Sequence, residues 1–367
     1  MSDTGLPAAA ESTVPTGYWH RREDGRIQCD LCPRLCTLQE GQRGLCFVRA
    51  RHDDQIVLTT YGRASGFCVD PVEKKPLNHF YPGTSALSFG TAGCNLACRF
   101  CQNWDISKSR EYDTLTDRAS PEAIAQRAVA LGCRSVAFTY NDPVIFHEFA
   151  VDVAAACRAQ GVRTVAVTAG YVMPEPRAEF YSAVDAANVD LKGFTEEFYR
   201  KACAGRLAPV LETLEYIHNE TDVWLEVTTL LIPGLNDSTA DVDRLTSWIV
   251  ERLGPDVPLH FTAFHPDFKM LDRPPTPRAT LTAARQVAID NGLRYVYTGN
   301  VQDTAGQTTN CHHCGGVLIE RDGYRLGRWN LDDSGRCLSC GRTCPGVFDD
   351  SGPGTWGARR LPISFAR

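Results

Sequence analysis

The segment Thr91-Ala-Gly-Cys94-Asn-Leu-Ala-Cys98-Arg-Phe-Cys101-Gln-Asn-Trp104 separates its cysteines by three and then two residues. It follows an apolar run over residues 86–90, which is typical of a buried strand. Three thiolates can hold three irons of a [4Fe–4S] cube, whereas ordinary electron-transfer clusters use four cysteines. The spacing therefore indicates a cluster with one iron open to another ligand. Three legs of a structural zinc site are the alternative.

Strand-like and helix-like patterns alternate on either side of this loop, over residues 86–300. Strands are predicted over residues 86–90, 135–140, 162–168, 187–191, 223–230, 259–264 and 293–297. Helices are predicted from the Ser120 cap to residue 131, over residues 144–160, from the Asp237-Ser238 cap to residue 253, and over residues 280–291. This alternation predicts an α/β fold whose parallel sheet curls toward a partial, roughly (β/α)6 barrel. Its chemistry is expected at the carboxyl ends of the strands.

Composition narrows the class of protein. The chain has 367 residues, 43% of them hydrophobic, and a formal net charge of −6, which is typical of a globular protein without affinity for nucleic acid or anionic membranes. No run of eighteen apolar residues is present, so no membrane span is predicted. Sixteen cysteines, mostly in Cys-x2-Cys or Cys-x3-Cys groups, indicate metal ligands in a reducing compartment. We therefore expect a cytoplasmic metalloprotein.

The cysteine groups also suggest the domain boundaries. We expect a flexible leader over residues 1–17, which lack the features of a secretory signal, and a cysteine-rich region over residues 18–85. The barrel is expected over residues 86–300. A small zinc-ribbon or rubredoxin-like domain with a tail is expected over residues 301–367.

The first group supplies four thiols within eighteen residues, from Cys29, Cys32, Cys36 and Cys46. Four soft ligands suit either zinc or an iron–sulfur cube. Their spacing differs from the paired Cys-x2-Cys knuckles of zinc sites, which favours an auxiliary [4Fe–4S] cluster over structural zinc. Such a cluster could relay electrons, bind substrate or give up a sulfide.

The last group pairs two Cys-x2-Cys knuckles, formed by Cys311, Cys314, Cys337 and Cys340. This pattern is typical of a zinc ribbon, in which a tetrahedral zinc would fold the small domain; iron is the main alternative. Cys68 and Cys344 are either packing residues or thiols with a role in cluster or sulfur chemistry. The remaining cysteines, Cys133, Cys157 and Cys203, are predicted to be packing residues.

Further motifs include Cys29-Asp-Leu-Cys32-Pro-Arg-Leu-Cys36, Asp70-Pro-Val-Glu-Lys-Lys-Pro76, Tyr140-Asn-Asp-Pro143 and Asp190-Leu-Lys192. With the Cys94 loop and the barrel pattern, they resemble the radical SAM superfamily. The resemblance is to its AmmeMemoRadiSam-type branch, which is similar to pyruvate formate-lyase activating enzymes. It covers about residues 18–350 and is specific for fold and cofactor but not for substrate.

The resemblance implies the chemistry. Cys94, Cys98 and Cys101 would hold a catalytic [4Fe–4S] cluster whose open iron binds S-adenosylmethionine (SAM). One-electron cleavage of SAM would yield a 5′-deoxyadenosyl radical that abstracts hydrogen from substrate, while the protein positions the reactants. We expect a small-molecule, biosynthetic substrate and a one-electron donor such as flavodoxin or ferredoxin.

Three other functions stay open. Radical sulfur insertion would use the auxiliary cluster or a cysteine as sulfur donor. A glycyl-radical activase would act on a large protein partner. A metal-stabilised interaction protein would bind nucleic acid through its ribbon tail, against which the acidic balance argues.

The resemblance also implies the SAM contacts. Tyr140, Asn141 and Asp142 stand where the family places an acidic motif that receives the SAM amino group, with Asp142 in place of the branch's usual Glu. An ordinary Asn-Asp-Pro turn is the alternative reading. Thr168 follows a strand at which the family offers polar contacts to SAM.

Two further motifs supply catalytic candidates. Asp190 and Lys192, two residues apart in a strand, point to the same face and resemble the Asp-x-Lys pair that lines the SAM and substrate cavity of activases. A local ion pair is the alternative. His265, which precedes Pro266, is either a proton donor or substrate contact, or a hydrogen-bonded loop residue.

Overall fold

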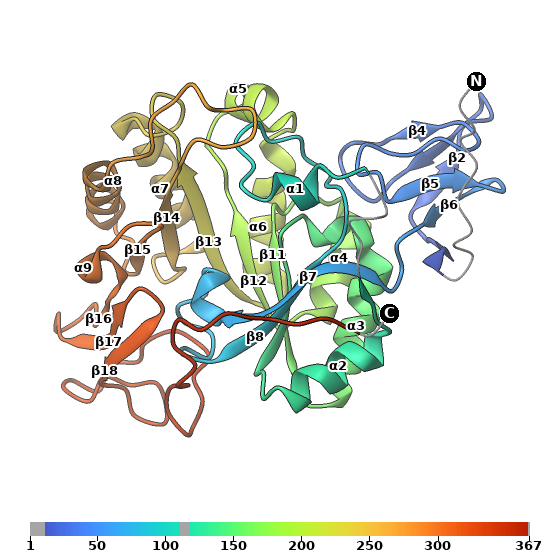
Figure 1. Cartoon of the computed structure of the whole chain (residues 1–367). Helices are drawn as coiled ribbons and strands as arrows, with labels where there is room; N and C mark the ends of the chain where they lie inside the picture. Colours follow the sequence, from blue (N-terminus) through green and yellow to red (C-terminus); the bar gives the residue numbers. More distant parts are fainter. Residues whose placement is uncertain (1–11, 111–116, 366–367) are drawn as a thin grey trace.

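The computed structural model describes residues 12–110 and 117–365. Its largest sheet contains a run of seven parallel strands, each paired with the next of the run (Figure 1). These strands are β8 (Ser85–Gly90), β10 (Ser135–Phe138), β11 (Arg163–Thr168), β12 (Ala186–Asp190), β13 (Trp224–Leu231), β14 (Leu259–Ala263) and β15 (Val296–Gly299). The predicted α/β architecture with a parallel sheet is confirmed.

The sheet has more strands than predicted, and its first and last described strands are not paired with each other. Antiparallel strand β7 (Arg63–Pro71) extends it beyond β8, and β7 pairs in turn with β9 (Asp117–Arg118) and with β19 (Leu361–Pro362) in the tail. Among the described residues, β15 forms one edge and β19 the other, so the hydrogen bonds do not close a barrel.

Helices follow the parallel strands as expected. The longer ones are α2 (Pro121–Ala130), α3 (His147–Ala159), α4 (Pro174–Ala183), α6 (Ala208–Glu220), α7 (Thr239–Leu253) and α8 (Arg278–Asp290). Ser120 and Ser238 cap α2 and α7 as predicted, because their hydroxyls accept hydrogen bonds from Ala123 N and Asp241 N. The sequence prediction omitted α4 and α6. Short helices are α1 (Trp104–Ser107), α5 (Glu196–Phe198) and α9 (Thr304–Gln307).

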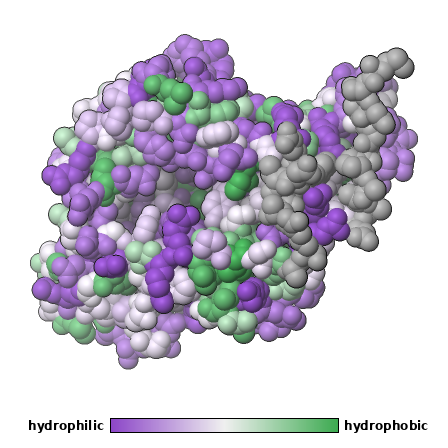
Figure 2. Space-filling model, viewed as in Figure 1, coloured by the Kyte–Doolittle hydropathy of each residue, from purple (hydrophilic) through white to green (hydrophobic). Residues whose placement is uncertain are grey.

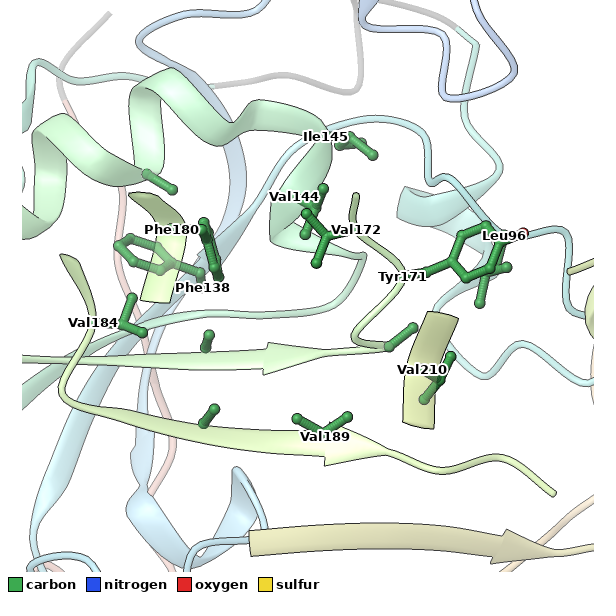
Figure 3. Packing of buried hydrophobic residues seen from close by; sticks show 14 of the residues in the cluster. Leu96, Phe138, Val144, Ile145, Tyr171, Val172, Phe180, Val184, Val189 and Val210 are labelled. Carbon is green, nitrogen blue, oxygen red and sulfur yellow. The ribbon is translucent and has the colours of Figure 1, made fainter. Parts of the chain in front are cut away.

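The main core lies between the sheet and these helices. Buried side chains from the sheet, such as Phe138 and Val189, pack with Phe180 of α4 and Val210 of α6. Figure 3 shows part of this core. Leu96, from the loop at residues 94–101 that we call the cysteine loop, lies beside Tyr171. The cysteine loop is therefore attached to the hydrophobic core.

A second, smaller core covers the other face of the sheet. Residues 72–81, which we call the inner segment, contribute Val72, Leu77, Phe80 and Tyr81 to it, and these pack against Ala86, Ala137, Val165 and Ala186. Alternate residues of each strand face opposite sides of a sheet, so these small side chains let the inner segment approach closely. Glu226 of β13 anchors it, because its carboxylate accepts the backbone N–H groups of Asn78 (3.0 Å) and His79 (2.7 Å).

Small sheets flank the central one at both ends of the chain. The N-terminal region forms β1 (Val14–Pro15), β2 (Trp19–Arg21), β3 (Ile27–Cys29), β4 (Thr37–Leu38), β5 (Arg49–His52) and β6 (Gln55–Leu58). The C-terminal region forms β16 (Thr309–Asn310), β17 (Val317–Asp322) and β18 (Arg325–Trp329). Of the predicted leader, residues 1–11 lie outside the described residues, whereas β1 pairs with β6.

The tail returns from the C-terminal sheet to β7, and Figure 1 shows it in dark red crossing in front of the central strands. Its β19 is therefore held against the same strand that leads into the inner segment. In the part of the chain that the structure describes, no helix has the length and apolar character needed to cross a membrane.

Candidate active site

A cavity of about 420 Å³ lies at the carboxyl ends of the parallel strands. All three cysteines of the 94–101 loop line it, together with residues that follow β10, β11 and β12. Hydrophilic residues cover much of the face seen in Figure 2. The predicted residues that line the cavity are Cys94, Cys98, Cys101, Tyr140, Asn141, Asp142, Thr168, Asp190 and Lys192. The fold therefore brings together side chains that the sequence places on four separate strand ends.

Hydrogen bonds from neighbouring strand ends fix the cysteine loop. The side-chain amide of Asn141 donates hydrogen bonds of 2.7 Å to the carbonyl oxygens of Thr91 and Gly93. Asn95 Nδ2 donates a hydrogen bond of 2.9 Å to Tyr171 O. Gly93 has φ = +83°, and a Cβ there would lie 1.9 Å from the carbonyl oxygen of Cys46. Only glycine fits this close approach. Asn141 thus holds the loop in addition to lining the cavity.

Cys98 has a thiol neighbour that the sequence did not indicate. Cys203 lies on the one-turn helix at residues 199–203, and its backbone carbonyl oxygen accepts a hydrogen bond of 3.0 Å from Ala97 N in the loop. The side chain of Cys203, assisted by the charges of Lys192 and Lys108, lowers the pKa of Cys98 to about 6 despite its burial. The thiolate is the metal-binding form of cysteine. Cys203 was expected only to pack, and its position far along the chain offered no sign of this contact.

Asp142 is buried at the end of β10. Its carboxylate accepts hydrogen bonds from Thr168 Oγ1 (3.0 Å), Val144 N (3.1 Å) and Ala169 N (3.2 Å). Burial raises the pKa of Asp142 to about 6, and these hydrogen bonds oppose the rise. Its charge at neutral pH is therefore costly without a cation beside it.

Asp190, the last residue of β12, and Lys192, just beyond it, form an ion pair of 2.7 Å, the alternative reading of this motif, and both line the cavity. Burial disfavours the lysine charge, but Asp190 and the thiols of Cys98 and Cys203 hold the pKa of Lys192 well above its usual value. Lys192 therefore carries a positive charge next to the cysteine loop.

His265 is not brought to this site. Its side chain is 56% exposed and contacts Pro266 and Asp267 of its own loop. The cavity instead includes Lys74, Lys75, Tyr324 and Arg360, which sequence reasoning missed. The Asp70-Pro-Val-Glu-Lys-Lys motif was the available signal for the two lysines.

The four N-terminal thiols share a second, small cavity. Cys29, Cys32, Cys36 and Cys46 line it, together with Arg34, Arg49 and Asn95. Arg49 is fully buried and pairs with Glu148, and one nitrogen each of Arg34 and Arg49 is buried without a hydrogen-bond partner. Burial raises the pKa of Cys46 to about 12. These two guanidinium nitrogens without partners, beside buried thiols, favour an occupant that makes this site anionic.

The four C-terminal thiols gather much more tightly. Their sulfur atoms all lie within 4.8 Å of one another, with Cys311 Sγ and Cys340 Sγ 3.6 Å apart and Cys314 Sγ and Cys337 Sγ 3.8 Å apart. Zinc–sulfur bonds of about 2.3 Å in a tetrahedron place sulfurs about 3.8 Å apart. Among the described residues, this is the one group of thiols compact enough for a single ion.

The other cysteines lie outside these sets. Cys344 is buried in a small hydrophobic cluster with Tyr295 and Tyr297, and its sulfur is 3.8 Å from His79 Nδ1. Cys68 is buried on β7, with its sulfur 3.6 Å from Asp70 Oδ1. Cys133 and Cys157 lie in the main core, as their predicted packing role requires.

Comparison with known proteins gave a match to one family model, described as the radical SAM superfamily, over residues 89–245. Uncharacterized protein MJ0808 of Methanocaldococcus jannaschii is 39% identical over 325 residues, which cover 88% of this chain and 96% of that protein. The pyruvate formate-lyase 1-activating enzyme of Escherichia coli is 24% identical over 170 residues, 45% of this chain and 68% of that enzyme. Among solved structures, a radical SAM methyltransferase from Sphaerobacter thermophilus covers 83% of this chain and 81% of its own, at 16% identity and a TM-score of 0.47.

Proposed function

Because the chain belongs to the radical SAM superfamily, in a branch related to pyruvate formate-lyase activating enzymes, we propose that it is a radical SAM enzyme acting on a small molecule. The observation that carries this proposal is the convergence of Cys94, Cys98 and Cys101 on one cavity with Asp142 and Lys192.

The residues of the cavity fit a [4Fe–4S] cluster and SAM. Three thiols suit three irons, and the lowered pKa of Cys98 favours its ligating form. Within the described residues, these thiols do not form a set compact enough for one ion, which disfavours the zinc alternative. When bound, the cluster and SAM supply one-electron cleavage of SAM and a carbon radical that abstracts hydrogen.

The protein's own residues would orient these partners. Asp142, buried with its pKa raised, would gain most from pairing with the SAM ammonium, and Thr168 holds its Oδ1 in place. Lys192, held by Asp190, offers a cation for a carboxylate. Asn141 fixes the loop that carries the thiols.

We further propose a metal at each flanking cysteine group. At the N-terminal site, the four thiols are too widely spaced for one ion, and one buried nitrogen each of Arg34 and Arg49 has no partner; both observations support an auxiliary [4Fe–4S] cluster. At the C-terminal site, thiol separations of 3.6 and 3.8 Å support one tetrahedral zinc. One electron must enter from a small donor protein, for which flavodoxin or ferredoxin is suited.

The proposal is tested by anaerobic reconstitution followed by addition of dithionite and SAM. The wild-type protein should release 5′-deoxyadenosine, and Cys98→Ala should not. Cys157→Ala is the matched control, since Cys157 is buried in α3 outside the cavity and should leave the yield unchanged. Equal yields from Cys98→Ala and the control would refute the proposal.

A second candidate, a glycyl-radical activase, is favoured by the similarity to the activating enzyme of Escherichia coli. It requires a large protein partner. The tail and Tyr324 of the C-terminal domain border the cavity, which narrows the room for such a partner. This candidate would be supported by a glycyl radical signal in the electron paramagnetic resonance spectrum after the chain is mixed with a glycyl-radical enzyme.

A further inference from the structure

One end of the active-site cavity concentrates positive charge around a single carboxylate. Asp70 is fully buried on β7, and two ammonium groups contact it, Lys74 Nζ and Lys75 Nζ, each at 3.0 Å. Arg360 Nε, from the tail, lies 3.3 Å from the same carboxylate. Three cations thus share one negative charge, and all three line the cavity that contains the cysteine loop.

These cations are not fully satisfied by the protein. Lys75 is 2% exposed and has three N–H donors, and Asp70 is the one acceptor that the described residues place within hydrogen-bond distance of its Nζ. Burial lowers the pKa of Lys75 to about 8, while Lys75 and Lys74 together outweigh burial and lower that of Asp70 to about 2. The side chains of Lys74 and Arg360 are 25% and 64% exposed and so partly solvated, whereas Lys75 is buried and shares its one carboxylate with both, so its ammonium gains most from a further anion.

The remaining charges of the cavity do not supply that anion. Of the two carboxylates among the described residues that line the cavity, Asp190 is paired with Lys192, and Asp142 accepts hydrogen bonds from Thr168 Oγ1, Val144 N and Ala169 N. Glu73 lines a neighbouring cavity, and its Oε1 accepts a hydrogen bond from Gly83 N. SAM carries a sulfonium, an ammonium and one carboxylate, so it adds no net negative charge.

The position of the cations suits a substrate. Lys74 and Lys75 belong to the inner segment, which packs against the sheet, whereas Arg360 lies on the tail beside β19. The tail is fixed there, since Leu361 and Pro362 pair with Val69 and Cys68. The side chain of Arg360 is 64% exposed, so it can reach an incoming ligand. A second cavity of about 470 Å³ shares Lys74 and Tyr324 with the first, which extends the available space.

We infer that Lys74, Lys75 and Arg360 form a binding site for an anionic group, a carboxylate or a phosphate, of the enzyme's small substrate. This inference rests on the proposed function, because it places the substrate's charge at one end of the cavity and its reacting carbon toward the cysteine loop. Ammonium and guanidinium donors make short, charge-assisted hydrogen bonds to both kinds of anion.

The experiment is calorimetric titration of the anaerobically reconstituted full chain, saturated with SAM, with inorganic phosphate and separately with succinate. At least one anion should bind the wild type, and Arg360→Gln and Lys74→Gln should each weaken it about tenfold. Arg359→Gln is the matched control, because Arg359 is the tail neighbour that stacks on Trp356 outside the cavity. Binding of phosphate alone assigns a phosphorylated substrate, and binding of succinate alone a carboxylate.

Two results would overturn the inference: neither anion binds the wild type, or Arg360→Gln and Lys74→Gln bind as tightly as Arg359→Gln. Release of 5′-deoxyadenosine by the same wild-type sample is measured in parallel. If it is released without anion binding, the anion site is refuted and the proposed function stands. If anions bind but no 5′-deoxyadenosine forms, the proposed function fails instead.

Discussion

Arg34 Nε donates a hydrogen bond of 2.7 Å to the backbone carbonyl oxygen of Asn95. Arg34 lies between Cys32 and Cys36, and Asn95 lies between Cys94 and Cys98. This bond therefore joins the N-terminal cysteine group directly to the loop that carries Cys94, Cys98 and Cys101. Asn95 lines the cavity of the first group, while its neighbours Cys94 and Leu96 line that of the second. The two sites are therefore built on opposite sides of one loop.

Arg34→Met should disturb both sites through this bond. Loss of a hydrogen bond from a charged donor costs about 1.5–3 kcal/mol of stability. We expect a lower melting temperature and a weaker SAM-induced change in the electron paramagnetic resonance spectrum of the reduced protein. Arg99→Met, in the same loop but with an exposed side chain, should change neither. Spectra of Arg34→Met that match those of this control would show that the bond does not couple the sites.

Cys32→Ala should remove the auxiliary cluster and leave the catalytic one. Iron content after reconstitution should fall by about four atoms per chain and not to zero, since a [4Fe–4S] cube holds four irons. The spectral response to SAM should remain. If the wild type binds only about four irons and Cys32→Ala binds as many, the N-terminal thiols hold no such cluster.

Cys203→Ala should make cluster assembly require a higher pH. The side chain of Cys203 makes the largest contribution to lowering the pKa of Cys98 to about 6. Without it, less Cys98 thiolate is present at neutral pH. The rate of iron incorporation should therefore begin to increase only at a higher pH than in the wild type. Cys157→Ala, another buried cysteine, serves as control. Superimposable pH profiles of the two variants would contradict this role.

SAM binding should weaken as pH falls through about 6, where Asp142 becomes protonated and can no longer pair with an ammonium. Asp142→Asn should bind SAM weakly at all pH values and lose this dependence, as measured by SAM titration of the cluster absorbance.

The stability of the folded protein should depend on pH in the opposite direction from SAM binding. Because the folded protein binds a proton at Asp142 more tightly than the unfolded chain, its contribution to stability falls as pH rises from about 3.8 to 6. Exposed Asp105→Asn is the control.

Cys337→Ser should release one zinc per chain and loosen the C-terminal domain. The ribbon core includes Tyr295 and Tyr297, the latter on β15, so the loss should also lower the melting temperature of the whole protein. Metal analysis and limited proteolysis over residues 311–348 measure both effects. Cys344→Ala should keep its zinc, because Cys344 is outside the compact set. Equal zinc in wild type and Cys337→Ser would rule out the assigned ligands.

Local sequence was sufficient for the parts of this protein whose geometry is local. The spacing of Cys94, Cys98 and Cys101 indicates one shared ligand, and Ser120 and Ser238 mark helix starts, because these contacts span only a few residues. Asp190 and Lys192 are two residues apart at the end of β12, so their ion pair is also a local contact.

Other features depend on which distant segments the fold brings together. Cys203 reaches Cys98, and Arg360 reaches Asp70, only because the helix at residues 199–203 and β19 dock at particular places on the sheet. His265 also follows a strand, as the other candidate residues do, yet its side chain is 56% exposed and contacts Asp267 of its own loop.

The sequence alone determined the ligand types, the parallel α/β class and the likeness to radical SAM enzymes, since coordination chemistry and side-chain periodicity are encoded in neighbouring residues. Tertiary structure decided which thiol tunes Cys98, where the excess positive charge lies, and how the two cysteine sites share one loop. These depend on strand register and long-range packing, whose energies are set by residues far apart in the chain.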